Sequence, residues 1–120
     1  MAAIRTPQDS AHTAAEAVRA YNHATFPGNL LYPVQAYHSV ASFKVMAQRL
    51  PQSFDQTSRA LNRLHADGTL TADYGRVADH VGEAVAALAE ASRYAGMLAN
   101  ALDQAHNALS PIGFCDDIDN

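Results

Sequence analysis

An apolar residue recurs at every third or fourth position from residue 74 to residue 109, and this repeat restricts the possible fold more than any other feature of the chain. The spacing is typical of an amphipathic helix that buries one face. Its members are Tyr74, Val77, Val81, Ala84, Leu88, Ala91, Ala95, Leu98, Leu102, Ala105 and Leu109. Thr71 and Asp73 suit the start of this helix, and Ser110-Pro111 suits its end.

A second repeat of the same kind predicts another long helix, for which Pro33 suits the first turn. Its members are Ala36, Val40, Phe43, Ala47, Leu50, Phe54, Thr57, Leu61 and Leu64. Pro51 lies inside the repeat, where a proline costs roughly 3 kcal/mol and removes a backbone hydrogen bond. Because the repeat keeps its phase across Pro51, we expect one kinked helix, with two separate helices as the alternative.

The connections between helices are short. Asp67-Gly68 ends the second helix, and a connection of about four residues allows only antiparallel neighbours. Thr6-Pro7-Gln8-Asp9 has the form of a helix start, and the first helix should run to Ala24. We therefore expect an all-α fold, with a long antiparallel helical hairpin and a short N-terminal helix. It should form a single domain over residues 1–110, followed by an acidic tail at 111–120.

A hairpin of two helices is too thin to bury both of its sides. Many of the inward positions are alanine, so the two long helices should approach each other closely. The first helix, a second copy of the chain, or both must cover what the hairpin leaves open. The sequence thus predicts a helical bundle that is completed by dimerisation.

The last helix carries a second stripe, made of small residues, which we call the small-residue face. Its members are Gly75, Ala78, Gly82, Val85, Ala89, Ser92, Gly96 and Ala99. A glycine inside a helix costs about 1 kcal/mol relative to alanine, and close approach of another helix is the usual reason for one. We interpret this stripe as an interaction face for a second protomer. Packing of the first helix of the same chain is the alternative.

The two long segments carry opposite charge. Residues 33–66 hold Lys44, Arg49, Arg59 and Arg63 against Asp55, whereas the last helix is mostly acidic. This pattern favours antiparallel pairing, and a basic ridge for an acidic partner is the alternative.

The tail interleaves the large apolar residues Ile112, Phe114 and Ile118 with acids, a composition that suits a short docking peptide. Alternatively, Ile112 and Phe114 fold back on the open end of the hairpin.

Charge and composition narrow the function classes. The net charge of −4 and a pI near 5.8 argue against direct binding of nucleic acid. The first residues contain no apolar stretch after a basic end, and nowhere do about 18 apolar residues run together, so we expect neither a signal peptide nor a membrane partner. The single cysteine, Cys115, fits a reducing compartment, which indicates a cytoplasmic protein.

Patterns that support catalysis are missing from the sequence, which has neither a glycine-rich phosphate loop nor a nucleophile turn. Six histidines include pairs with a carboxylate one helical turn away. None of those pairs lies on the inward stripes, where a helical bundle would hold a metal. We therefore expect a non-enzymatic protein with no catalytic residue, no metal and no cofactor.

Leu31-Tyr32-Pro33, Arg49-Leu50-Pro51 and Ala101-Leu102-Asp103-Gln104-Ala105 resemble segments of small, uncharacterised Ala-rich helical proteins of GC-rich Gram-positive bacteria. Some of those proteins are encoded near plasmid or integrative-element genes, and the resemblance implies a bacterial accessory protein.

The hairpin is also similar in outline to the WXG100 family of type VII secretion substrates. The motifs of that family are absent, because the chain has no tryptophan and no tyrosine followed four positions later by an acid.

These observations favour a non-enzymatic helical protein–protein interaction or accessory module that self-associates as a homodimer or binds another helical protein. One alternative is a helical bundle that binds a small molecule in a cavity opposite Ala84, Ala91 or Ala95. Another is a hairpin substrate of a type VII-like secretion system.

Overall fold

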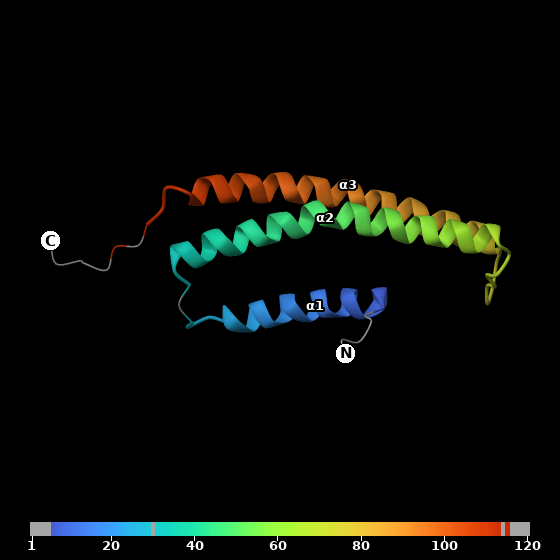
Figure 1. The fold of residues 1–120 in the computed structure, drawn as a ribbon, viewed down its shortest axis with the longest axis horizontal. Coiled ribbons are helices and arrows are strands. Elements are labelled where there is room, and N and C mark those ends of the chain that lie inside the picture. Colours follow the sequence, from blue (N-terminus) through green and yellow to red (C-terminus); the bar gives the residue numbers. More distant parts are fainter. Residues whose placement is uncertain (1–5, 30, 114, 116–120) are drawn as a thin grey trace, which may run out of the picture. The chain divides into compact units, whose positions relative to one another are not determined.

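In a computed structural model, the chain is all-helical over the residues it describes, which are 6–29, 31–113 and 115. The helices are α1 (Pro7–Ala24), α2 (Pro33–Ala66) and α3 (Val77–Leu109) (Figure 1). No strand occurs within these residues, so the predicted fold class is confirmed. None of the helices in this part of the chain combines the length and the apolarity needed to cross a membrane.

The chain forms two compact units, residues 1–32 with α1 and residues 33–120 with α2 and α3. The single domain expected over residues 1–110 stays a prediction. α1 begins as the sequence predicts: the backbone N–H of Asp9 donates to Thr6 Oγ1 at 3.1 Å, and the N–H of Thr6 donates to Asp9 Oδ2 at 3.3 Å. No residue of α1 is buried.

α2 and α3 pack along each other as the expected hairpin. α2 continues through Pro51, so a single helix is confirmed over the alternative of two. Its axis changes direction near its middle (Figure 1). Ser53 Oγ also donates to the carbonyl oxygen of Arg49 at 3.4 Å, a type of bond that often accompanies helix bending.

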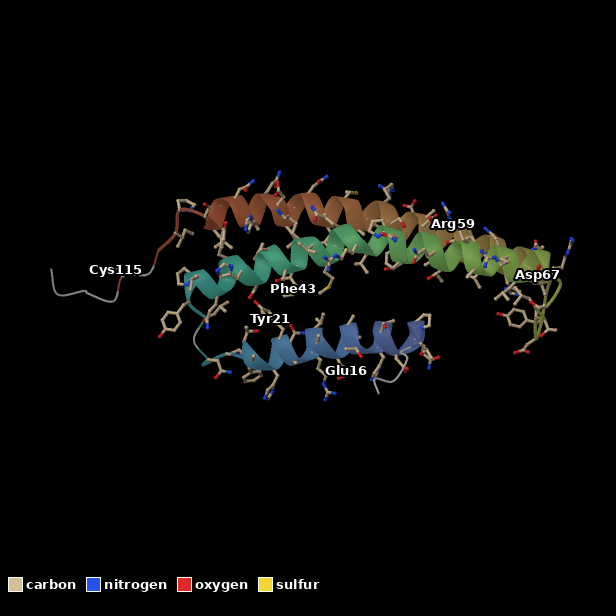
Figure 2. All side chains as sticks on the ribbon, in the orientation of Figure 1. Glu16, Tyr21, Phe43, Arg59, Asp67 and Cys115 are labelled. Carbon is tan, nitrogen blue, oxygen red and sulfur yellow. The ribbon has the colours of Figure 1, made fainter. Side chains whose placement is uncertain are left out.

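Asp67 follows the last residue of α2 at the tip of the hairpin (Figure 2). The N–H of Gly68 donates to the carbonyl of His65 at 3.0 Å, and the N–H of Thr69 donates to that of Leu64 at 3.3 Å. Gly68 has a φ of +72°, the left-handed conformation that glycine adopts most easily after a helix. The predicted stop at Asp67-Gly68 is therefore confirmed.

The start predicted for the last helix is wrong, because α3 begins at Val77 and not at Thr71 or Asp73. Gly75 has a φ of +70°, which no helix accommodates. The ring N–H at His80 Nε2 donates to the carbonyl oxygen of Tyr74 at 2.8 Å, and the two rings meet edge to face at 5.1 Å. His80 thereby ties the connection to the first turn of α3.

The buried apolar core of the described residues is small. It consists of Ala47, Val81, Ala95 and Ala99, each less than 9% exposed. Five side chains expected in the seam between the helices are exposed instead: Thr57, Leu64, Tyr74, Leu98 and Ala105. A straight helix drifts by roughly 20° per heptad relative to a seven-residue repeat, so a repeat this long cannot face α2 throughout.

Replacing Gly75 by alanine should lower the free energy of unfolding by about 1–2 kcal/mol, because the left-handed conformation is strained for any other residue. The added Cβ would also lie 3.0 Å from His80 Nε2. Urea unfolding followed by circular dichroism measures the loss.

Gly68→Ala is the matched control, because its φ is similar but nothing lies within 4 Å of the added Cβ. Equal losses in the two variants would show that the His80 contact contributes nothing.

Candidate interaction surface

Several large apolar side chains of the hairpin are exposed to solvent. On α2 they are Val34 at 59%, Met46 at 37% and Leu64 at 42%, and on α3 they are Tyr94 at 55%, Met97 at 57% and Leu98 at 49%. Exposed apolar side chains that gather on one surface mark interaction sites, whereas scattered ones do not. Their arrangement around the two helices therefore decides whether they form an interaction site.

Helix periodicity places most of these side chains on one side of the hairpin. Each residue is rotated by about 100° from the one before it. On α2, Met46 and Leu64 are rotated about the helix axis from Ala47, which faces α3, in the direction of earlier residues; we call this backward. On α3, Tyr94 and Leu98 are rotated backward in the same way from Ala95, which faces α2. Because the two helices are antiparallel, the same sense of rotation leads to the same side of the hairpin.

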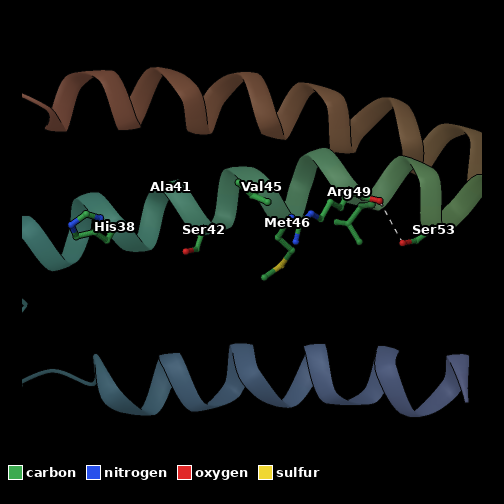
Figure 3. Close-up of a pocket in the computed structure, with 8 residues that line it drawn as sticks. His38, Ala41, Ser42, Val45, Met46, Arg49 and Ser53 are labelled. Atoms are coloured by element: carbon green, nitrogen blue, oxygen red, sulfur yellow. Dashed lines mark hydrogen bonds between the residues drawn. The ribbon is translucent and has the colours of Figure 1, made fainter. Parts of the chain in front are cut away.

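We call this side the large-residue face, formed by Met46, Leu50, Leu61 and Leu64 of α2 with Tyr94 and Leu98 of α3. Figure 3 shows Met46 of this face on α2, with its side chain pointing away from α3. Met97 lies at the outer edge of the large-residue face.

Tyr94 is held in place by its neighbours. The guanidinium of Arg93 lies over the Tyr94 ring, 4.6 Å from the ring centroid, and also pairs with the carboxylate of Glu90. A hydrogen bond from Arg93 contributes most to lowering the pKa of Glu90, followed by a hydrogen bond from Tyr94 and then by the charge of Arg93. The pair stays ionised near neutral pH and presents an aromatic ring beside two opposite charges.

Contacts between α2 and α3 identify the side of the hairpin that is opposite the large-residue face. Lys44 Nζ lies 3.1 Å from Asp103 Oδ1, and the rings of Tyr37 and His106 stack with centroids 4.2 Å apart. These four residues are rotated forward from Ala47 and Ala95, the reverse of the large-residue face. They fix the register, in which Lys44 is level with Asp103.

The small-residue face lies on this opposite side, and the structure divides it. Part of it is exposed on α3: Ala78, Gly82 and Ala89. Another part is half-buried or buried along the seam with α2: Val85, Ser92, Gly96 and Ala99. Gly75 lies in the connection before α3. Its positive φ and the nearby ring of His80 explain why a glycine stands at this position. Nothing lies within 4 Å of a Cβ added at Gly82 or Gly96, so close approach within the described chain does not account for these glycines.

A concavity of about 400 Å³ lies on the same side, beside the proline in α2. Pro51 and Phe54 line it from α2, and Val85, Leu88 and Ala89 line it from α3. The sequence predicted a cavity opposite Ala84, Ala91 or Ala95, and none of these three lines this one.

Of the predicted docking tail, only Ile112 falls within the described residues, and it is 53% exposed. Phe114 and Ile118 lie outside them. Cys115 is an exposed thiol (Figure 2). Among the residues that the structure describes, no three His, Cys, Asp or Glu side chains gather where they could hold a metal ion.

Sequence reasoning missed the large-residue face because it assigned Leu64 and Leu98 to the seam. The signal was present: Tyr94, Met97 and Leu98 are spaced as neighbours on a helix surface. The heptad pattern, which ignores the drift of a straight helix, placed Leu98 in the seam. It gave no role to Tyr94 or Met97.

Gly82→Ala should raise the free energy of unfolding by about 1 kcal/mol, because alanine loses less backbone entropy in a helix. Thermal unfolding at low protein concentration measures the gain. Ala78→Gly, an exposed position on the same face, should lose a similar amount. A loss of stability in Gly82→Ala would instead mean that another helix packs closely against this glycine.

No family model, curated protein or solved structure matches this chain.

Proposed function

We propose that this protein is a non-enzymatic helical interaction module that self-associates through the large-residue face. The observation that carries the proposal is the contrast between its core and its surface. Among the described residues, three alanines and one valine are buried, while Met46, Tyr94 and Leu98 are between 37% and 55% exposed. A second helical layer on this face would supply the core that the hairpin lacks.

The hairpin is long enough for a stable dimer. α3 has 33 residues and spans about 50 Å at 1.5 Å per residue. With two helices of about 10 Å diameter side by side, the whole side of the hairpin that carries the large-residue face presents on the order of 1,000 Å². A standard protein–protein interface needs about 800 Å² per partner, so the interface would extend beyond the stretch from Met46 to Leu64.

The chemistry of the side chains supports interaction over catalysis. Tyrosine and methionine are enriched in the centres of interfaces. No polar or charged side chain in the described residues is buried, although catalytic groups commonly acquire their perturbed pKa values through burial. We extend the proposal to a cytoplasmic protein without a nucleic-acid partner, on the basis of its single cysteine and its net charge of −4.

Sedimentation equilibrium of the full chain tests the proposal. We expect a dimer at tens of micromolar, and we expect Leu98→Gln to weaken it at least tenfold, which corresponds to about 1.4 kcal/mol. Leu98 is half-exposed in the single chain, so glutamine should leave the helix content unchanged by circular dichroism.

Gly82→Leu is the control on the opposite side, and it should leave the dimer intact. A monomeric wild-type protein at this concentration would refute self-association. If Gly82→Leu dissociates the dimer and Leu98→Gln does not, the interface lies on the small-residue face instead.

A second candidate function is the binding of a small apolar molecule, and the concavity beside Pro51 favours it. Its volume of about 400 Å³ lies within the range of small-molecule sites. We expect an apolar probe that binds there to raise the melting temperature of the wild type but not of Ala89→Phe, which fills the concavity. A panel of such probes without any stabilising compound would count against this function.

A further inference from the structure

We infer that the second copy docks with its α3 over α2 of the first and its α2 over α3, so that both hairpin tips lie at the same end of a four-helix bundle. This inference rests on the proposed self-association through the large-residue face. It specifies how the two copies are oriented, which the existence of a dimer does not determine.

Two twofold arrangements can bring the large-residue faces together. If the symmetry axis runs along the helices, each α2 lies over the partner's α3 and the tips coincide. If the axis runs across the helices, α2 lies over α2 and α3 over α3, with the tips at opposite ends. The two arrangements bury the same face and differ only in which helices become neighbours.

Charge favours the first arrangement. α2 carries four basic side chains and one acidic one, whereas α3 carries four acidic and one basic. With the axis along the helices, every pair of neighbouring helices in the bundle combines a basic with an acidic helix. With the axis across them, two of the four neighbouring pairs have like charge. Exposed ion pairs contribute little to affinity, but such patterns select orientation and exclude alternatives.

Side-chain size favours the same arrangement independently. On the large-residue face, α2 contributes the bulky side chains Met46, Leu50, Leu61 and Leu64. α3 contributes Tyr94 and Leu98 together with several small residues, including Ala87, Ala101 and Ala105. Well-packed layers place large residues opposite small ones. Stacking α2 on α2 would crowd one half of the interface and leave gaps in the other.

The register of the two helices shows which large residues of α2 would lie opposite which small residues of the partner's α3. Because Lys44 is level with Asp103, Leu61 and Leu64 of one copy would come level with the first half of the partner's α3. Ala84 and Ala87 lie there and leave room for leucine. Met46 would come level with Leu98 and Ala101.

Distances between spin labels in the full chain test the orientation. Ala66→Cys marks the hairpin tip and Val34→Cys, an exposed position, marks the open end, each in a Cys115→Ser background. Two tips at one end of a bundle of helices about 10 Å wide should give label distances below about 35 Å. Two tips at opposite ends should give about 50 Å, the length of the hairpin.

A mixture of the two labelled chains provides the reciprocal measurement. The inferred arrangement predicts long distances between a tip label and an open-end label, whereas the alternative predicts short ones. Short tip-to-tip distances with long mixed distances support the inference, and the reverse pattern overturns it. A monomeric mass, with no dipolar signal at either position, would instead refute the proposed self-association.

Discussion

Close approach through alanine is the interaction on which the rest of this structure depends. Ala47 of α2 and Ala95 and Ala99 of α3 are three of the four buried residues in the described part of the hairpin. Because their side chains are single methyl groups, the two helices can pack closely, and bulky residues beside them are directed out of the seam. The narrow seam therefore produces both the well-defined hairpin and the apolar surface that it leaves open.

The sequence predicts the fold in detail where local chemistry decides the outcome. The capping box at Thr6, the stop at Gly68 and the end of α3 at Leu109 all depend on residues within one helical turn of the boundary. The start of α3 was missed because the helix-starting residues Thr71 and Asp73 were weighed above Gly75. The left-handed conformation of Gly75 follows from the path of the connection and from His80, neither of which is visible as a pattern.

The candidate surface was harder to predict because it depends on rotation around a helix axis. An error of a few tens of degrees moves a residue from the seam to the surface, and this happened with Leu64 and Leu98. The small-residue face stays a prediction as an interaction surface, and its inner members, such as Ala99, are buried within the hairpin itself. Composition alone could not separate residues that pack within the hairpin from residues that stay exposed on it.

The hydrogen bond between His80 and the carbonyl of Tyr74 fixes the tautomer of the histidine ring. A carbonyl oxygen only accepts, so Nε2 carries the proton of this bond. The bond joins two residues on either side of Gly75, and their rings also meet edge to face. One side chain therefore closes the turn into a loop, so the last part of the connection moves together with the start of α3.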